Sequence, residues 1–219
     1  MDEVESLKEM KTAKSKSRIY WGRIKKLGPQ KFIFKNISTK DSDEERILLE
    51  IRIWEKLETS EKPKAIPRFV GFIKDETKKA KLTDIDYYLI FEKFPYNLRN
   101  LIDLLKEKDE NLPLDKLLYF ARTLIEAMTF LQTNKISHRD FKPENLLLDS
   151  NFENIYVIDF SESKEVKSYT STTMNSIVGT SKYLSPELKE IHDNGDEGTL
   201  SKFNFFKSDV FSFGLVCWN

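Results

Sequence analysis

Short β-branched and aromatic segments, separated by polar stretches, dominate the N-terminal part of the chain. Residues 18–23 and 31–36 have this composition, as do residues 66–73 and 87–91. Such segments, bounded by turn-forming or charged residues, are typical of short β-strands. The charged stretch 74–81 predicts the loop between the last two of them. The pattern therefore predicts a small region that is rich in strands.

One amphipathic helix interrupts these strands. Ser42, Asp43 and Glu44 favour a helix start, because acidic side chains stabilise the first turn. Apolar residues then recur at intervals of three and four positions, which places them on one helical face. These residues are Ile47, Leu48, Ile51, Trp54 and Leu57.

From residue 96 onward, apolar residues recur with the period of a helix. The pattern predicts a short amphipathic helix over 98–105, a longer one over 114–133 and an apolar helix over 209–219. A short buried strand is predicted over 154–160, and the Ser/Thr-rich stretch 161–175 has no apolar period. The chain is therefore predicted to be α+β, with a β-rich region followed by a mainly helical one.

Length and charge bound the class of protein. With 219 residues, the chain can form one large domain or two small lobes that share an interface. Its 36 basic and 36 acidic residues cancel, so no strong field favours nucleic acid or an anionic membrane. No apolar run approaches the roughly 20 residues that span a bilayer. We therefore expect neither a nucleic-acid partner nor a membrane span.

Cysteine usage bears on the compartment. Cys217 is the only cysteine, so it can form no disulfide within the chain. Together with the lack of a signal-like leader, this indicates a reducing compartment. The expected location is cytoplasmic or nuclear.

Candidate chemistry concentrates in residues 138–145, whose sequence is His-Arg-Asp-Phe-Lys-Pro-Glu-Asn. Asp140, Lys142 and Asn145 provide a carboxylate, an ammonium and an amide. The carboxylate can take a proton from an acceptor hydroxyl, the ammonium can neutralise phosphate charge, and the amide oxygen can hold Mg²⁺. A charged turn after a helix is an alternative reading of His-Arg-Asp alone. The full spacing, ahead of an apolar run and Asp159, favours phosphoryl transfer.

Four segments carry a resemblance to a known family. Residues 138–145 resemble the catalytic loop of eukaryotic protein kinases, H-R-D-x-K-x-x-N, with every fixed position filled. Asp159-Phe160-Ser161 resembles the D-F-G motif, residues 179–187 resemble the segment that ends in A-P-E, and residues 209–214 resemble the start of the central helix of the C-lobe. The resemblance spans about residues 10–219.

The resemblance implies a protein-kinase-like fold of two lobes. A small β-rich N-lobe with one helix would cover residues 10–94, and a mainly helical, partial C-lobe would cover residues 95–219. Residues 1–9 would form an N-terminal extension. Because the family continues with several more helices after the central one, we expect the chain to be a fragment of a longer domain.

The resemblance also implies a role for each residue of the catalytic set. Asp140 would orient and deprotonate the acceptor hydroxyl, and Lys142 would steady the transferring phosphate. Asn145 and Asp159 would hold Mg²⁺. Lys142, two residues after Asp140, follows the pattern of serine/threonine kinases and not that of tyrosine kinases.

A second set of residues would bind the nucleotide. Lys35, which ends the apolar stretch 32–35, stands in place of the family's V-A-I-K lysine, and Glu50 would be its ion-pair partner. Together they would position the phosphates of ATP. The remaining contacts to ATP would come from Ile19, Ile33, Glu92, Phe94 and Leu147.

A third set of residues would bind the protein substrate and take part in regulation by phosphorylation. Thr180 would contact Asp140 and Lys142 and help to seat the substrate. Phosphorylation of the Ser/Thr-rich stretch, at Ser176 or next at Thr173, would order it by pairing with Arg139. Asp209 would hydrogen-bond the backbone of the catalytic loop.

Three features depart from the family pattern. Aligning Ile19 with the last position of G-x-G-x-x-G-x-V places side chains where glycines should cover the phosphates. These positions are Thr12, Lys14 and Ser17. Ile33 replaces a small residue above the adenine, and Ser161 replaces the glycine of D-F-G, which would restrict the backbone there.

The favoured interpretation is a serine/threonine protein kinase that uses ATP and Mg²⁺ on a protein substrate. The alternative is a pseudokinase, which would use the same fold as a protein-binding module with little or no turnover. The three departures support the alternative. The complete set of Lys35, Asp140, Asn145 and Asp159 supports the enzyme. A small-molecule kinase is disfavoured, because residues 179–187 suit a protein substrate.

Overall fold

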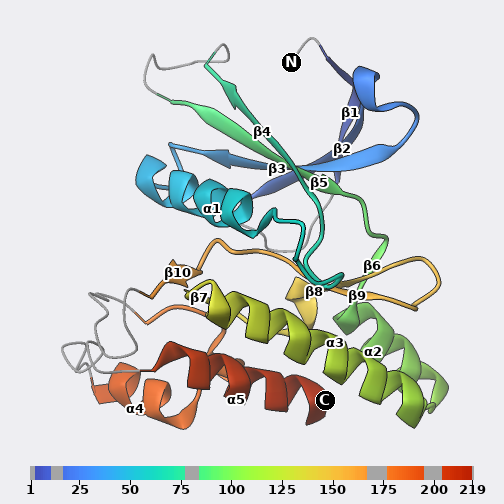
Figure 1. Cartoon of the computed structure of the whole chain (residues 1–219), viewed down its shortest axis with the longest axis vertical. Helices are drawn as coiled ribbons and strands as arrows, with labels where there is room; N and C mark the ends of the chain where they lie inside the picture. Colours follow the sequence, from blue (N-terminus) through green and yellow to red (C-terminus); the bar gives the residue numbers. More distant parts are fainter. Residues whose placement is uncertain (1–2, 11–16, 77–83, 167–176, 195–203, 219) are drawn as a thin grey trace. The chain divides into compact units, whose positions relative to one another are not determined.

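The structure is a computed structural model, shown in Figure 1. It describes residues 3–10, 17–76, 84–166, 177–194 and 204–218.

The chain divides into two compact units. The N-terminal unit comprises residues 1–59 and 67–93, and the C-terminal unit comprises residues 60–66 and 94–219. The first is a sheet with one long helix and the second is mainly helical. The predicted α+β architecture of two lobes is confirmed.

The N-terminal unit is built on one antiparallel sheet of five strands, in the order β1-β2-β3-β5-β4. The strands are β1 (Val4–Met10), β2 (Arg18–Ile24), β3 (Lys31–Ser38), β4 (Phe69–Asp75) and β5 (Asp86–Glu92). A single 3-10 turn, η1 (Lys25–Leu27), follows β2. The four segments that were predicted as strands correspond to β2, β3, β4 and β5.

The edge strand β1 was not predicted, and most of it lies in the expected extension 1–9. Its apolar residues are Val4, Leu7 and Met10, a spacing of three that does not match the two-residue period of a strand. The register against β2 shifts between Glu5 and Lys8. A bulge adds one residue to a strand and changes which side chains share a face. Because of the bulge, apolar and polar residues do not alternate along β1, and the sequence pattern did not predict this strand.

Gly22 on β2 lies beside this bulge. A Cβ at Gly22 would come within 3.2 Å of both the Glu5 carbonyl oxygen and the Phe34 ring. Such contacts are tighter than ordinary van der Waals packing, so glycine lets β1 approach β2 closely at this point.

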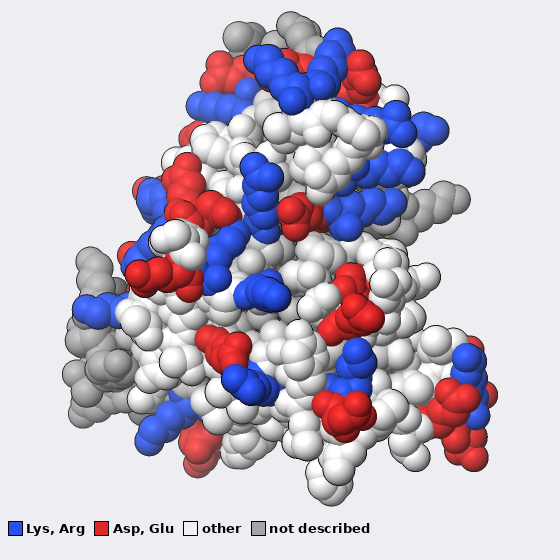
Figure 2. Space-filling view, turned by 45° about the vertical axis from the view of Figure 1, so that its right-hand side comes forward, with Lys and Arg blue, Asp and Glu red and all other residues white. Residues whose placement is uncertain are grey.

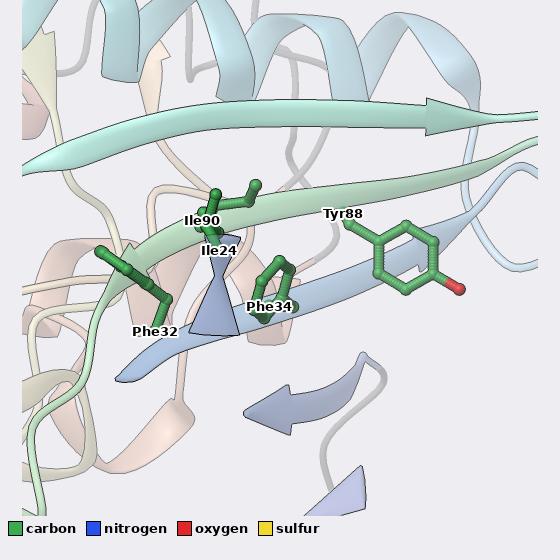
Figure 3. Packing of buried hydrophobic residues seen from close by; sticks show 5 residues of the cluster. All are labelled: Ile24, Phe32, Phe34, Tyr88 and Ile90. Atoms are coloured by element: carbon green, nitrogen blue, oxygen red, sulfur yellow. The ribbon is translucent and has the colours of Figure 1, made fainter. Parts of the chain in front are cut away.

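The two faces of the sheet pack differently. One face holds an apolar cluster that Figure 3 shows, and partly buried Val4 and Leu7 of β1 add to it. The labelled residues of the cluster are Ile24, Phe32, Phe34, Tyr88 and Ile90. The helix α1 (Glu44–Leu57) lies against the other face, where Trp54 packs 4.8 Å from Phe91, measured between ring centroids.

The C-terminal unit contains the other helices of the described residues. They are α2 (Leu98–Lys108), α3 (Leu114–Thr133), α4 (Pro186–Asn194) and α5 (Phe205–Trp218), with the 3-10 turns η2 (Pro143–Asn145) and η3 (Ser181–Tyr183). The same unit also contains two small antiparallel sheets. One has three strands, β6 (Tyr96–Asn97), β8 (Leu146–Leu148) and β9 (Ile155–Val157). The other has two strands, β7 (Ile136–Ser137) and β10 (Lys164–Glu165).

Two helices of the C-terminal unit, α2 and α5, begin at a capping side chain. Helix α2 begins with a reciprocal pair, because the side chains of Asn97 and Asn100 each accept a hydrogen bond from the other's backbone N–H. Helix α5 begins at Phe205, four residues before the predicted start at Asp209. Asn204 explains this start, since its side chain accepts a hydrogen bond from the Lys207 N–H.

Charged side chains of both signs cover the face that Figure 2 shows, and basic ones gather on one side of the N-terminal unit. In the described ranges, no helix has both the length and the apolar character that crossing a bilayer requires.

Candidate active site

The loop after β7 takes its shape from Asp209 of α5. One oxygen of this buried carboxylate accepts hydrogen bonds from the Ser137 hydroxyl and the His138 N–H, both at 2.8 Å. The other oxygen accepts from the Arg139 N–H, also at 2.8 Å. Arg139 has a positive φ of 68°, and the carboxylate holds this uncommon conformation. The contact that was predicted between Asp209 and the loop backbone is present.

Two opposing effects act on Asp209. Burial raises the pKa of its carboxyl, and this is the larger effect. The His138 imidazole and the three donors lower the pKa, because they stabilise the ionised form.

His138 joins the loop to the strand that leads to Asp159. Its Nε2 lies 3.0 Å from the Ile158 carbonyl oxygen, and its Nδ1 accepts a hydrogen bond from the Asp140 N–H at 3.3 Å. These partners assign the proton to Nε2. The ring also packs 5.1 Å from the Phe160 ring. His138 therefore couples the positions of Asp140 and Asp159.

Asp140 is the centre of a dense polar cluster. Its Oδ1 accepts hydrogen bonds from the N–H and the hydroxyl of Thr180, at 3.0 and 2.8 Å. Its Oδ2 accepts from Lys142 Nζ at 2.6 Å and from Asn145 Nδ2 at 3.0 Å. Lys142 Nζ also donates to the Thr180 hydroxyl at 2.9 Å. The structure thus brings together Asp140, Lys142 and Asn145 with Thr180, whose contact with Asp140 and Lys142 the family resemblance implied.

The orientation of Asn145 suits a cation. Its Nδ2 donates to the backbone carbonyl of Asp140 at 2.9 Å as well as to the Asp140 carboxylate. Its Oδ1 accepts no hydrogen bond from the described residues, and so is available as a ligand. The Asn145 carbonyl oxygen accepts from the Ile158 N–H at 3.0 Å, which ties the loop to the residue before Asp159.

The donor set fits Mg²⁺. Asn145 and Asp159 provide an amide oxygen and a carboxylate, and Mg²⁺ commonly takes one or two protein ligands together with phosphates and water. No group of three or more His, Cys, Asp or Glu side chains in the described part of the chain could hold a metal by itself. A site that shares its metal with a phosphate is therefore the kind that these residues favour.

Ser161 occupies a backbone conformation that a side chain tolerates. Positive φ falls on Asp159, at 67°, and Ser161 is not among the described residues with positive φ. The predicted restriction therefore imposes no strain at Ser161 in this conformation, since glycine is required only where φ is positive.

Lys35 and Glu50 form an ion pair in the N-terminal unit, with Nζ and Oε1 2.8 Å apart. Their side chains are 12% and 3% exposed. The predicted pairing of these two residues is present.

The residues around Lys35 share one face of the sheet. Directly paired residues of antiparallel strands lie on the same face, and Lys35 pairs with Ile19 and Leu89. The neighbouring row pairs Ile33 with Trp21 and Phe91. Two predicted nucleotide contacts, Ile19 and Ile33, therefore lie on the face that carries Lys35.

Trp21 was missed in the sequence. It faces Ile33 across the strand pair and follows Ile19 by two positions, a spacing that could have revealed it. The ammonium groups of Lys8, Lys31 and Lys93 lie 4.9–5.4 Å from its ring centroid, within the range of cation–π contacts.

The other predicted nucleotide contacts lie near the end of β5 and on β8. Glu92 is the last residue of β5, in the N-terminal unit. Phe94 belongs to the C-terminal unit, where its ring packs 4.2 Å from that of Tyr156. Leu147 of β8 pairs with Tyr156 of β9. Phe94 and Leu147 therefore share Tyr156 as a neighbour.

Arg99 of α2 was also missed. Its Nε lies 3.1 Å from Glu144 Oε1 and its Nη2 donates to the Tyr183 hydroxyl at 2.9 Å. Burial raises the pKa of the Tyr183 phenol, and the Arg99 guanidinium opposes this. Arg99 thereby links α2, the catalytic loop and the segment before α4. No local pattern marks it, because its partners are 45 and 84 residues away.

Several predicted positions lie outside the described residues. They are the phosphorylation candidates Thr173 and Ser176, together with Thr12 and Lys14 of the phosphate-covering loop.

Comparison with known proteins decides the family. The model of a family described as "Protein kinase domain" matches residues 21–219. The chain belongs to the protein kinase family.

Individual relatives agree with this kinase assignment. "Mitogen-activated protein kinase kinase 9" of Arabidopsis thaliana is 39% identical over 102 residues, which are 46% of this chain and 30% of that protein. "Kinase and exchange factor for Rac B" of Dictyostelium discoideum is 28% identical over 144 residues, or 63% of this chain and 12% of that protein.

A yeast kinase gives a similar match. "Serine/threonine-protein kinase PKH2" of Saccharomyces cerevisiae is 34% identical over 108 residues, or 45% of this chain and 9% of that protein. The matched region is thus less than a third of the length of each of these three relatives.

Gly179 sets the position of Thr180 in this kinase domain. Gly179 has a φ of 108°, and a Cβ there would lie 2.4 Å from the Arg139 carbonyl oxygen. We expect Gly179→Ala to lower the free energy of unfolding by about 2–4 kcal/mol, because backbone strain adds to a clash that no side-chain movement relieves. Urea denaturation measures this change.

Gly214→Ala is the matched control for Gly179→Ala. Gly214 lies in α5 with no atom within 4 Å of a Cβ added there. Alanine in a helix should be neutral or should stabilise by up to about 1 kcal/mol. Equal urea midpoints for the two variants would contradict the proposed close contact at Gly179.

Proposed function

We propose that this protein is an active serine/threonine protein kinase that transfers the γ-phosphoryl group of ATP, with Mg²⁺, to a hydroxyl on a protein substrate. The observation that carries the proposal is the cluster around Asp140, in which Lys142, Asn145 and Thr180 all donate to one carboxylate. A structural turn has no need for an ammonium, an amide and a hydroxyl on the same group.

Asp140 would act as the base that orients the acceptor. A carboxylate has about four acceptor positions, and four donors occupy those of Asp140. An incoming hydroxyl must therefore displace one donor. Lys142 is suited to leave, since its ammonium can move from Asp140 to the transferring phosphate. The exchange would free Oδ2 for the hydroxyl proton and bring positive charge to the phosphate.

Asn145 and Asp159 would hold Mg²⁺, with Asn145 Oδ1 available on the side away from Asp140. The metal would neutralise charge on the phosphates of ATP. Because His138 connects the Asp140 backbone to the Ile158 carbonyl, the base and the metal ligand would keep a constant relation to each other.

The nucleotide would bind the sheet face that carries Lys35. The Glu50 carboxylate fixes the Lys35 ammonium, which can then hold phosphate oxygens. Ile19, Ile33 and, from the C-terminal unit, Leu147 would contact the base. Glu92 and Phe94 would offer backbone groups to it.

The proposal also covers the protein substrate, its regulation and the location of the domain. Thr180, bound to both Asp140 and Lys142, would seat a Ser/Thr-containing protein segment. Phosphorylation at Ser176 or Thr173 would regulate that segment. We place the domain in the cytoplasm or nucleus, with an N-lobe over 10–94 and a partial C-lobe over 95–219, and β1 adds to that N-lobe.

A pseudokinase is the second candidate, and specific residues favour it. Thr12, Lys14 and Ser17 stand in place of glycines that would let the backbone approach phosphates. Ile33 is larger than the small residue of the family pattern, so it would leave less room for the adenine base on this face. Ser161 no longer supports this candidate strongly, because its conformation suits a side chain.

Phosphate transfer from γ-labelled ATP with Mg²⁺ distinguishes the two candidates. An active enzyme should label peptide libraries that contain Ser or Thr and leave Tyr-only libraries unlabelled. ATP with Mg²⁺ should also raise the melting temperature. A shift in melting temperature without transfer would establish a nucleotide-binding pseudokinase. If ATP with Mg²⁺ gives neither a shift in melting temperature nor phosphate transfer, the nucleotide site is ruled out as well.

A further inference from the structure

The first turn of α1 is joined to β5 by one short hydrogen bond. The Tyr87 hydroxyl donates to Glu44 Oε1 at 2.5 Å. The Tyr87 residue is 1% exposed, so its hydroxyl must find its partners within the protein, where Glu44 accepts its hydrogen bond and Lys74 lies beside it. Burial, and next the Glu44 carboxylate, raise the pKa of the phenol, which keeps Tyr87 protonated as a donor. Lys74 Nζ lies 3.8 Å from the same Glu44 oxygen.

Helix α1 contacts β5 at two points. Tyr87, Leu89 and Phe91 alternate along β5 and therefore share one face of the sheet. At one end Tyr87 meets Glu44, and at the other Phe91 meets Trp54.

The spacing of these contacts matches on the two elements. Glu44 and Trp54 are separated by about 15 Å along a helix, and Tyr87 and Phe91 by about 13 Å along a strand. Lys35, which pairs with Leu89, meets Glu50 between the two ends.

The two polar contacts lie at different points around α1. With 3.6 residues per turn, Glu44 and Glu50 project about 120° apart around the helix axis. Glu50 projects near the centre of the buried face, between buried Trp54 and Leu57, and Glu44 projects at its edge, next to buried Ile51. Rotation of α1 about its axis would move both carboxylates relative to the sheet. Together the two contacts define a single rotation of the helix.

We propose that Tyr87 is a positioning residue, which acts through Glu44 to hold α1 in the rotation that keeps Glu50 on Lys35. The proposal rests on the proposed function, because the Lys35–Glu50 pair is the part of the site that would hold ATP. It adds a contact that no motif contains. Tyr87 and Glu44 are 43 residues apart and neither would touch the nucleotide.

Tyr87→Phe isolates the hydroxyl, since the ring and its packing stay. We expect kcat/KM for ATP to fall about three- to tenfold, the effect of losing one part-buried hydrogen bond of ordinary strength. Glu44→Ala should have a similar effect, and Glu44→Gln, which keeps an oxygen acceptor, should restore most of the activity. The double variant Tyr87→Phe/Glu44→Ala should be no worse than either single one, because both remove the same contact.

Two control variants match these changes. Tyr88→Phe removes a phenol from the opposite face of the same strand, where Tyr88 belongs to the apolar cluster. Glu45→Ala removes a carboxylate from the same first turn of α1 without touching Tyr87. Both should stay within about twofold of the parent chain, as expected for changes away from the contact.

A second readout follows Lys35 itself, independently of turnover. Trace acetylation with acetic anhydride, followed by mass spectrometry, measures the reactivity of the Lys35 amine relative to exposed Lys189. Tyr87→Phe should raise Lys35 labelling severalfold, toward the level of Glu50→Gln, while Tyr88→Phe should not. Unchanged Lys35 labelling in Tyr87→Phe would overturn the positioning role whatever the activity. Failure of the parent chain to transfer phosphate would instead count against the proposed function.

Discussion

Asp140→Asn should lower the rate of phosphate transfer about 10²–10⁴-fold, the range for loss of a general base. Asparagine has nearly the same shape as aspartate but cannot accept a proton at neutral pH. Its NH₂ group would also face donors, since Lys142, Asn145 and the two groups of Thr180 all point at this side chain. Initial rates of phosphate incorporation, at saturating ATP and Mg²⁺, measure the effect.

The control for Asp140→Asn is the same change at an exposed carboxylate of the same unit. Asp193 is 77% exposed and contacts the adjacent His192. Asp193→Asn should retain the parental rate. If Asp140→Asn stays within threefold of the parent, the assignment of Asp140 as the base is wrong, and transfer must depend on another group.

Asp209→Ala should lower the free energy of unfolding by about 3–5 kcal/mol, the cost of removing one partner from a buried charged network. Three donors lose their acceptor together, namely the Ser137 hydroxyl and the N–H groups of His138 and Arg139. The donors of Ser137 and His138 are buried, and that of Arg139 is partly buried. Asp209→Asn keeps one acceptor oxygen and should lose about half as much. Urea denaturation, followed by tryptophan fluorescence, gives these values.

Val210→Ala is the control, because Val210 is the next residue of α5 and is 58% exposed. It should change stability by no more than about 0.5 kcal/mol. A denaturation midpoint for Asp209→Ala equal to that of Val210→Ala would show that the carboxylate does not hold the loop. Activity should fall in Asp209→Ala as well, since Arg139 would no longer be kept at its positive φ.

Much of the architecture was predictable because its signals are local. The helix over 114–133 was predicted with the bounds that α3 has, since its apolar period is regular. The strands β2, β3 and β5 stand close to their predicted positions. Local patterns failed where one residue changes the phase, as at the bulge of β1, and where a cap outweighs periodicity, as at Asn204 before α5.

The residues of the candidate site also differ in how far the sequence predicted them. Asp140, Lys142 and Asn145 lie within six residues of each other, so their spacing alone brings their side chains together once the chain turns. Thr180, Lys35 with Glu50, and Asp209 were anticipated through resemblance to a family whose fold joins those motifs. Trp21, Arg99 and Tyr87 belong to no such motif. The two-residue spacing from Ile19 could have indicated Trp21, whereas the partners of Arg99 and Tyr87 lie 43 to 84 residues away and no local pattern indicates them.

The amino-acid sequence by itself determined the chemical groups available to this kinase domain and the order of its strands and helices. Residue identity and local periodicity are properties of neighbouring positions. Only the tertiary structure decided that Ser161 sits without strain, that Asp140 has four donors, and that Tyr87 reaches Glu44. The backbone angle at Ser161 is not fixed by residue identity. The donors from Thr180 to Asp140 and the contact of Tyr87 with Glu44 join residues 40 and 43 positions apart, whose geometry arises only when strands pair and helices pack.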